Sequence, residues 1–323
     1  MDQISFEFYR HKEISYSNMN FDVIIIGAGL SGSYLARKVK ELGLNTLIIE
    51  KSKGIGGRFS TKPVGRGIAD YGCQYLKPKT KEFSELIQSL KNKNLIKKSN
   101  ILQDGEAFIA PYGMNKIPQY LSLGVSTLLN QKVSSIKKTS NQWEIKTNSF
   151  ILKSKMLVLT MPINQVSELL KVSDLAIPDL PTAAYKSFYT ITFQNMDAIS
   201  SKPVLKNDFA PWICNNFLKG LSIDQNIFTL NVNEEISNTL LNIEDNEKHE
   251  SINRYLKESG FKNFSFYNLH YWKYAFTDGQ NNVTNYFNKY NMLALCGDSF
   301  SVGQADGAVV SAQKTFEQIR NIF

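Results

Sequence analysis

Residues 21–58 read FDVIIIGAGLSGSYLARKVKELGLNTLIIEKSKGIGGR, and they carry the most informative pattern in the chain. A short apolar run ends in the glycine turn GAGLSG, an amphipathic stretch follows, and a second apolar run ends in Glu50. This order of strand, glycine turn, helix, strand and acidic residue is typical of a dinucleotide-binding βαβ unit. The stretch therefore predicts an α/β fold built on a Rossmann-type unit.

Each glycine of the turn has its own task in such a unit. Gly27 permits the tight turn, Gly29 lets the backbone approach a pyrophosphate, and Gly32 lets the helix pack closely on the strand. The helix N-terminus then offers free N–H groups and a positive dipole end to the phosphates. Glu50 suits a ribose diol and repels a 2′-phosphate. The predicted dinucleotide contacts are Gly27, Ala28, Gly29, Leu30, Ser31, Gly32, Glu50 and Lys51.

A second glycine cluster with a fixed cation, KSKGIGGR, follows directly at residues 51–58. Extra glycines and an arginine suit a pyrophosphate that is clamped from a second side, with the guanidinium against phosphate oxygens. Here the chain resembles the FAD-dependent oxidoreductases that include flavin amine oxidases, phytoene desaturases and renalases. The resemblance implies FAD as the cofactor, with Gly56, Gly57 and Arg58 among its contacts. An ordinary solvated loop arginine is the alternative for Arg58.

The C-terminal region carries LCGD at residues 295–298 and GQADGA at residues 303–308, which look like the C-terminal flavin motif of the same superfamily. Asp298 can accept a hydrogen bond from a ribityl hydroxyl. The N-terminus of a helix after Gly307 can stabilise negative charge on the flavin. The alternative is an Asp cap and a glycine turn before an ordinary helix. Further predicted cofactor contacts are Val133, Gly297, Asp298, Asp306, Gly307 and Ala308.

The segment DYGCQY at residues 70–75 resembles the D-x-G-A-Q-Y segment of renalases, and HYWKY at residues 270–274 adds to that likeness. The resemblance implies that Tyr71 and Gly72 lie against the isoalloxazine and that Gln74 reaches its redox edge. Cys73, at the small-residue position, suits the core better than a nucleophile. The candidate catalytic residues are Gln74, His270, Trp272 and Gln304, although His270 also suits a structural role in a strand between two lobes.

The element order predicts an α/β fold with a Rossmann-type FAD-binding lobe and an inserted substrate lobe of antiparallel sheet plus helices. Both lobes are expected to be discontinuous in sequence, as the resemblance implies. The predicted boundaries are a flexible extension at 1–18, an FAD-binding domain at 19–82, 125–162 and 290–323, and a substrate domain at 83–124 and 163–289.

Composition excludes several classes of protein. No apolar run approaches the ~20 residues of a membrane span, and the first 18 residues lack the apolar centre of a secretion signal. The three scattered cysteines form no CxxC pair and fit a reducing cytoplasm. The net charge is +8, and the clustered lysines suit solvated surfaces. No nucleic-acid partner is therefore expected. We therefore expect a cytoplasmic protein without a membrane partner.

The chain has one dinucleotide fingerprint and no metal-ligand cluster, nucleophile elbow or carboxylate pair. This sparse inventory indicates an FAD oxidase that takes a hydride from a small substrate and passes the electrons to O₂. Gln304 stands where amine oxidases usually place an aromatic residue, which favours a renalase-like oxidation of dihydro isomers of NAD(P)H, with H₂O₂ release and non-covalent FAD. The alternatives are a flavin amine oxidase and, in another class, a non-catalytic FAD-binding redox sensor or assembly factor.

Overall fold

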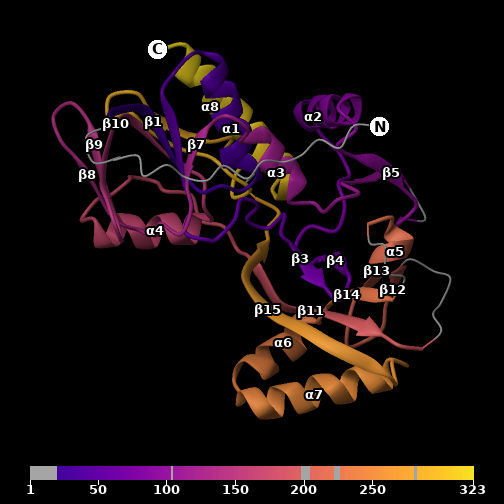
Figure 1. The fold of residues 1–323 in the computed structure, drawn as a ribbon. Coiled ribbons are helices and arrows are strands. Elements are labelled where there is room, and N and C mark those ends of the chain that lie inside the picture. Colours follow the sequence, from indigo (N-terminus) through magenta and orange to yellow (C-terminus); the bar gives the residue numbers. More distant parts are fainter. Residues whose placement is uncertain (1–19, 103–104, 198–203, 222–225, 280–281) are drawn as a thin grey trace.

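The structure is a computed structural model that describes residues 20–102, 105–197, 204–221, 226–279 and 282–323. The described chain forms two lobes, each around its own sheet (Figure 1). The predicted extension at residues 1–18 lies outside the described residues.

The first lobe, called the nucleotide lobe here, is built on a mixed sheet with a parallel centre. The strand order is β16-β17-β10-β1-β2-β7, and the β8–β9 hairpin joins through β10. The sequence pattern predicts two separate strands at 151–152 and 156–159, whereas the structure has one long strand, β10, that pairs with β9 at its start and with β17 at its end. The strands are β1 (Asn20–Ile26), β2 (Thr46–Ile49), β7 (Ser126–Leu128), β8 (Val133–Lys138), β9 (Trp143–Thr147), β10 (Ile151–Leu159), β16 (Tyr286–Asn288) and β17 (Leu293–Leu295).

From Val23 to Ile26, strand β1 is apolar because both of its faces are covered. Val23 and Ile25 face a core shared with helices α1 (Leu30–Glu41) and α8 (Gln304–Arg320). Ile24 and Ile26 face a second core, which includes side chains of helix α4 (Ile163–Val172). The alternation follows from the two-residue period of a strand.

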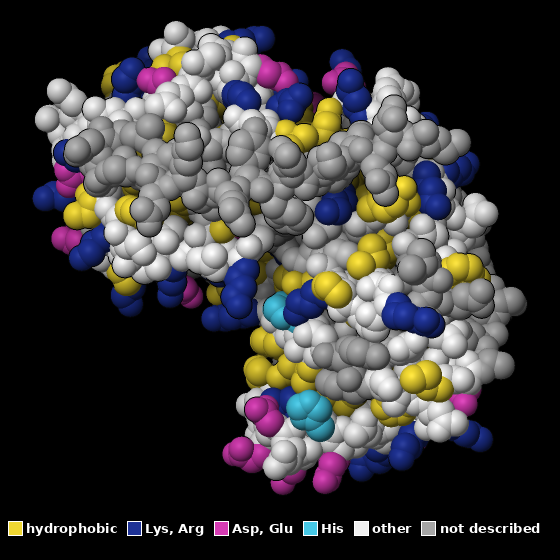
Figure 2. Space-filling model, viewed as in Figure 1, with side chains coloured by type: hydrophobic (Ala, Val, Ile, Leu, Met, Phe, Trp, Pro, Cys, Tyr) yellow, Lys and Arg dark blue, Asp and Glu magenta, His cyan; other side chains and the backbone are white. Residues whose placement is uncertain are grey.

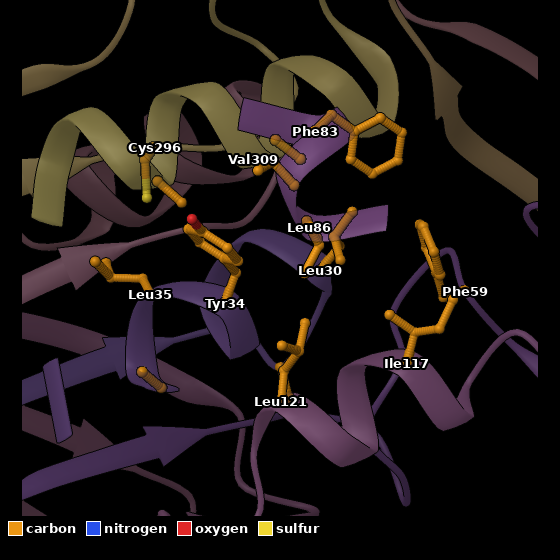
Figure 3. Packing of buried hydrophobic residues seen from close by; sticks show 14 of the residues in the cluster. Leu30, Tyr34, Leu35, Phe59, Phe83, Leu86, Ile117, Leu121, Cys296 and Val309 are labelled. Atoms are coloured by element: carbon orange, nitrogen blue, oxygen red, sulfur yellow. The ribbon is translucent and has the colours of Figure 1, made fainter. Parts of the chain in front are cut away.

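The first core also gathers helices α2 (Lys81–Asn92) and α3 (Lys116–Leu121). Figure 3 shows Leu30 and Tyr34 of α1 with Phe83 of α2, Ile117 of α3 and Val309 of α8 around one apolar interior. The sequence assigns both α2 and α3 to the substrate domain, but they pack here against the nucleotide lobe. The domain boundaries remain a prediction.

The second lobe, called the substrate lobe here, contains a five-stranded antiparallel sheet in the order β12-β13-β14-β11-β15. Helices α6 (Glu234–Leu241) and α7 (Asp245–Glu258) cover one face of it, with Ile252 and Leu256 of α7 buried one turn apart. The elements of the sheet and the short helix α5 are β11 (Lys186–Asn195), β12 (Val204–Leu205), β13 (Trp212–Asn215), α5 (Asn216–Lys219), β14 (Ile227–Asn231) and β15 (Phe264–Phe276).

Two small hairpins complete the described fold. Strands β3 (Thr61–Val64) and β4 (Gly67–Asp70) pair with each other and contact β11 and β14 of the substrate lobe, between the two lobes in Figure 1. Strands β5 (Lys97–Ser99) and β6 (Ala107–Ile109) form the other hairpin. Within the described ranges, no helix is long and apolar enough to cross a membrane.

Candidate functional site

The glycine turn between β1 and α1 has two crowded positions and one open position. Gly27 has a φ of 109°, and a Cβ placed there would lie 2.6 Å from Thr160 Oγ1. A Cβ on Gly32 would lie 2.0 Å from the carbonyl oxygen of Gly27, so helix and turn touch there. A Cβ on Gly29, by contrast, meets no atom of the described residues within 4 Å. The open side of the turn is thus at Gly29, where a ligand can approach the backbone.

Glu50, at the end of β2, is buried with 7% of its surface exposed. Its Oε2 accepts the N–H of Ala28 at 2.9 Å, and its Oε1 accepts the N–H of Ser52 at 2.8 Å. These two bonds fix the carboxylate beside the glycine turn while each oxygen keeps a further lone pair for a ligand hydroxyl. Helix α1 begins beside it, and its N-cap Gly29 provides no side-chain cap, so the first N–H groups of the helix are available.

The second glycine cluster lies directly against the first. The N–H of Gly56 donates to the carbonyl of Ala28 at 2.9 Å. A Cβ on Gly57, whose φ is 54°, would come within 3.2 Å of the Cα of Gly29. Residue 57 therefore has to be glycine for two reasons, its left-handed backbone and its close neighbour. The structure brings both predicted glycine clusters to one place.

Arg58 and Asp298 are 240 residues apart in sequence and form a bidentate ion pair. The two guanidinium nitrogens donate to the two carboxylate oxygens at 2.5 and 2.6 Å, and Tyr185 donates to the same carboxylate at 3.2 Å. Burial alone would lower the pKa of Arg58, but the charge and hydrogen bonds of Asp298, together with Tyr185, outweigh it, and the pKa lies above its ordinary value. The sequence directs Arg58 to a phosphate and Asp298 to a ribityl hydroxyl; the structure shows both side chains bound to each other.

The C-terminal helix departs from the sequence expectation. Helix α8 begins at Gln304, not after Gly307, and the N–H of Gly307 donates to Gly303 inside the first turn. Gln304 is exposed and has a φ of 53°. The buried carboxylate of Asp306 accepts the backbone N–H groups of Lys79 and Thr80, at the start of α2, at 2.8 and 2.9 Å. The free N–H groups are those of the first turn from Gln304, because its N-cap offers no side chain.

The other predicted cofactor contacts range from buried to exposed. Gly297, at a φ of 145°, donates its N–H to Ser311 Oγ of α8 at 2.8 Å. Ala308 is buried on α8, in the first core. Val133 is half-buried at the first position of β8 and packs against the second core. Lys51 is exposed just after Glu50, and Ser31 is buried with its hydroxyl against Cys296 Sγ.

The segment from Asp70 to Gln74 follows β4 and turns back on itself. A Cβ on Gly72 would lie 2.0 Å from the carbonyl oxygen of Arg58, so only glycine fits. Gln74 is buried, and its Nε2 donates to the carbonyls of Asp70 and Gly72 at 2.7 and 3.0 Å. The amide of Gln74 thus holds its own loop in this structure. Burial raises the pKa of the Cys73 thiol to about 12, which leaves it protonated at neutral pH.

Sequence reasoning missed Lys219, the last residue of α5. Its side chain and that of Asp70 are both 0% exposed, and Lys219 Nζ lies 2.7 Å from Asp70 Oδ2. Lys219 Nζ also lies 3.5 Å from Gln74 Oε1, while Asp70 Oδ1 accepts the N–H of Met114 at 2.9 Å. This buried pair ties the substrate lobe to the segment after β4. Gly220, with a φ of 100°, marks the end of α5 in the sequence, but nothing local indicates the partner of Lys219.

An aromatic cluster lies where β15 meets the nucleotide lobe. Trp272 Nε1 donates to the carbonyl of Tyr71 at 3.0 Å, and the two rings stack with centroids 5.4 Å apart. His270 meets both rings edge-on, with centroids 4.3 Å from Trp272 and 5.3 Å from Tyr71. On the opposite face of β15, Leu269 and Tyr271 pack against the core under α6 and α7. The structure therefore brings three predicted site residues together.

The titration of His270 makes stability depend on pH. Burial, and secondly the charge of Lys62, lower the pKa of His270 below its ordinary value of 6.5. Below pH 6.5 the unfolded chain takes up a proton that the folded chain resists, so the free energy of unfolding falls as pH falls. We expect the wild type to lose more stability than His270→Gln between pH 7.5 and 5.5, by at most about 1.4 kcal/mol per pH unit.

Urea unfolding at the two pH values measures this difference. His249→Gln, at an exposed position of helix α7, is the matched control, and its stability should change with pH as that of the wild type does. Parallel pH profiles for the wild type and His270→Gln would contradict the assigned direction of the His270 pKa shift.

No group of three or more His, Cys, Asp or Glu side chains able to hold a metal ion occurs in the part of the chain that the structure describes.

Comparison with known proteins agrees with this geometry. Residues 25–90 match the family described as NAD(P)-binding Rossmann-like domain. A flavin-containing amine oxidase from Oncorhynchus mykiss is 39% identical over 59 residues, which are 18% of this chain and 11% of that protein. A Drosophila melanogaster protein, provisionally assigned as lysine-specific histone demethylase 1, is 39% identical over 51 residues, 16% of this chain and 6% of that protein. The matches thus cover small parts of both relatives.

Solved structures share the architecture over nearly the whole chain. A provisionally assigned protoporphyrinogen oxidase from Exiguobacterium sp. 255-15 superposes with a TM-score of 0.75 at 12% identity, covering 95% of this chain and 100% of that one. Cyclohexylamine oxidase from Brevibacterium oxydans IH-35A gives a TM-score of 0.69 at 14% identity, covering 94% and 99%. At these identities the likeness establishes the fold. The predicted fold class, a Rossmann-type lobe with a separate antiparallel sheet, is confirmed.

Proposed function

We propose that this protein is an FAD-dependent oxidoreductase. The observation that carries the proposal is the open glycine turn at Gly29, with the buried carboxylate of Glu50 fixed beside it and two uncapped helix N-termini, those of α1 and α8. Such a donor set suits a dinucleotide, because N–H groups and helix dipoles bind phosphate and a carboxylate binds a ribose diol. The Rossmann match over residues 25–90 and the fold support the same conclusion.

In this proposal, different residues bind different parts of the cofactor. The turn from Gly27 to Gly32 and the N-terminus of α1 hold the pyrophosphate, and Glu50 holds the adenosine ribose. The N-terminus of α8 lies ready to stabilise negative charge on the reduced cofactor. When bound, FAD would supply the hydride acceptor for the substrate and the reductant for O₂, which would take up two protons and leave as H₂O₂. We also propose that FAD is held non-covalently and that the protein works in the cytoplasm.

The proposed substrates are dihydro isomers of NAD(P)H, which are oxidised to NAD(P)⁺. Two observations support them besides the renalase resemblance at residues 70–75. The stacked pair of Tyr71 and Trp272 offers flat surfaces beside the proposed site, suited to a planar ring. Gln304 is exposed and contributes no aromatic wall, unlike the aromatic residue expected in an amine oxidase.

Anaerobic mixing tests the proposal. The purified protein should show flavin absorbance, and acid precipitation should leave that absorbance in the supernatant because the cofactor is non-covalent. Mixing with the 1,2- or 1,6-dihydro isomers should bleach the flavin faster than mixing with ordinary NADH. Equal rates for all three would overturn the substrate, and a colourless protein would overturn the cofactor.

Two other functions are distinguished by the same preparation. Peroxide formation that depends on added amines would indicate an amine oxidase. Bound FAD that no dihydronicotinamide or amine reduces would indicate a non-catalytic redox sensor or assembly factor. Steady peroxide release with a dihydronicotinamide excludes the latter.

A further inference from the structure

We propose that Lys62 and one face of β15 form a subsite for an anionic group of the substrate, set beside the aromatic surface that receives its ring. The inference rests on the proposed function and adds to it the part of the substrate that is recognised away from the reacting ring. A nucleotide fits this description, because its phosphate is joined to its ring through one pentose.

One face of β15 runs from the flavin side of the site to Lys62. Asn268, His270 and Trp272 are spaced by two residues, and their pairing with β11 is regular, so they share a face; Tyr274 follows on the same strand after a register shift. At one end the carbonyl of Tyr274 accepts from Arg58, which binds Asp298. At a rise of about 3.3 Å per residue, the strand from Asn268 to Tyr274 extends about 20 Å.

Lys62, on β3, stands at the far end of this face. Its Nζ donates to Asn268 Oδ1 at 3.0 Å and lies 4.3 Å from the ring centroid of Tyr71. Tyr71 in turn stacks on Trp272 with centroids 5.4 Å apart, so the ammonium lies within roughly 10 Å of the Trp272 ring. The reach from ring surface to cation is therefore short enough for a single nucleotide.

The charge of Lys62 lacks a carboxylate partner among the described residues, where every ion pair within 4.0 Å involves other cations. Its surface is half-buried, and this burial lowers its pKa. A partly desolvated ammonium is stabilised by an anion, whose charge-assisted hydrogen bonds replace those lost to water. A phosphate group on the substrate provides that anion.

Asn268 holds the cation in place. Because its Oδ1 accepts from Lys62, its amide Nδ2 points elsewhere, and that nitrogen is buried without a hydrogen-bond partner in the described part of the chain. Figure 2 shows the molecule hollowed between its two lobes, with basic, histidine and hydrophobic side chains gathered at the hollow.

The experiment compares two ligands that differ only in the 5′-phosphate, oxidised nicotinamide mononucleotide and nicotinamide riboside. Their dissociation constants for the FAD-loaded protein are measured by quenching of tryptophan fluorescence and by the perturbed flavin spectrum. We expect the wild type to favour the mononucleotide about tenfold, and Lys62→Gln to lose this preference, because one charge-assisted hydrogen bond is removed. Lys273→Gln, at an exposed position of the same strand, is the matched control and should keep the preference.

The outcomes separate this inference from the proposed function. Wild-type protein that binds both ligands equally, or neither, overturns the subsite, as does a preference that survives in Lys62→Gln. If the dihydro isomers fail to reduce the flavin but the preference depends on Lys62, the proposed oxidation is wrong and the subsite stands. Equal FAD content in the three proteins shows that the substitutions leave the cofactor site folded.

Discussion

Replacement of Lys219 by methionine is expected to lower the free energy of unfolding by about 3–5 kcal/mol, because it leaves the carboxylate of Asp70 buried without its counter-charge. Both side chains are 0% exposed, so water cannot take over the role of the lysine. The carboxylate would retain the N–H of Met114 and the hydroxyl of Thr61, which satisfy hydrogen bonds but carry no full charge. Urea unfolding, followed by circular dichroism, measures the loss.

Two further variants make this prediction specific. Lys219→Met combined with Asp70→Asn removes both charges while the amide oxygen still accepts from Met114, so the double variant should be more stable than Lys219→Met alone. Lys98→Met breaks an ion pair with Glu106 whose members are 60% and 64% exposed, and it should cost less than about 1 kcal/mol. A loss of similar size for Lys98→Met and Lys219→Met would show that burial of the pair has no particular effect.

Replacement of Gly29 by valine is expected to weaken FAD binding about 10- to 100-fold while the fold stays intact. The backbone of Gly29 is extended, with a φ of −78° and a ψ of −174°, so a β-branched residue is allowed there. Its Cβ would meet no described atom within 4 Å, and only a bound ligand would feel the added methyl groups. Fluorescence titration of the apoprotein with FAD measures the affinity, and thermal unfolding of the apoprotein measures the fold.

Two other glycines provide the comparison. Gly54→Val also places a Cβ in open space, but at an exposed position outside the turn, and should retain wild-type affinity for FAD. Gly32→Ala should lower both stability and affinity, because its Cβ would lie 2.0 Å from the carbonyl oxygen of Gly27. If Gly29→Val binds FAD as tightly as Gly54→Val does, the cofactor does not approach this turn.

The elements predicted well from sequence are those determined by neighbouring residues. The run at 21–26 and the apolar spacing after Gly29 depend only on local periodicity, and both appear as β1 and α1. The second glycine cluster is also recognisable from sequence. Gly56 and Gly57 have φ values of 154° and 54°, which favour glycine whatever the loop packs against. Glu50 is identifiable because it directly follows the second apolar run, and the end of that strand lies beside the glycine turn.

The missed features depend on contacts between distant residues. Asp70 and Lys219 are 149 residues apart, and neither lies in a pattern that distinguishes a buried ion pair from two surface charges. Local motifs assign Arg58 and Asp298 each to the cofactor, and they do not indicate that the two side chains bind each other. The sequence predicts the last helix from Asp306, with its free N-terminus after Gly307, whereas α8 begins at Gln304 and Gly307 lets the chain pass Phe300 closely.

The pairing of β17 with β10 in the sheet of the nucleotide lobe has a consequence for biosynthesis. Strand β17 pairs with β10, which pairs with β1, and α8 packs against α1, so the earliest and latest segments of the described chain share one core. A ribosome releases the first βαβ unit long before Leu293–Leu295 leave the exit tunnel. The apolar surface that α8 covers then stays exposed until Gln304–Arg320 have left the tunnel, and the core of the nucleotide lobe is completed only after that.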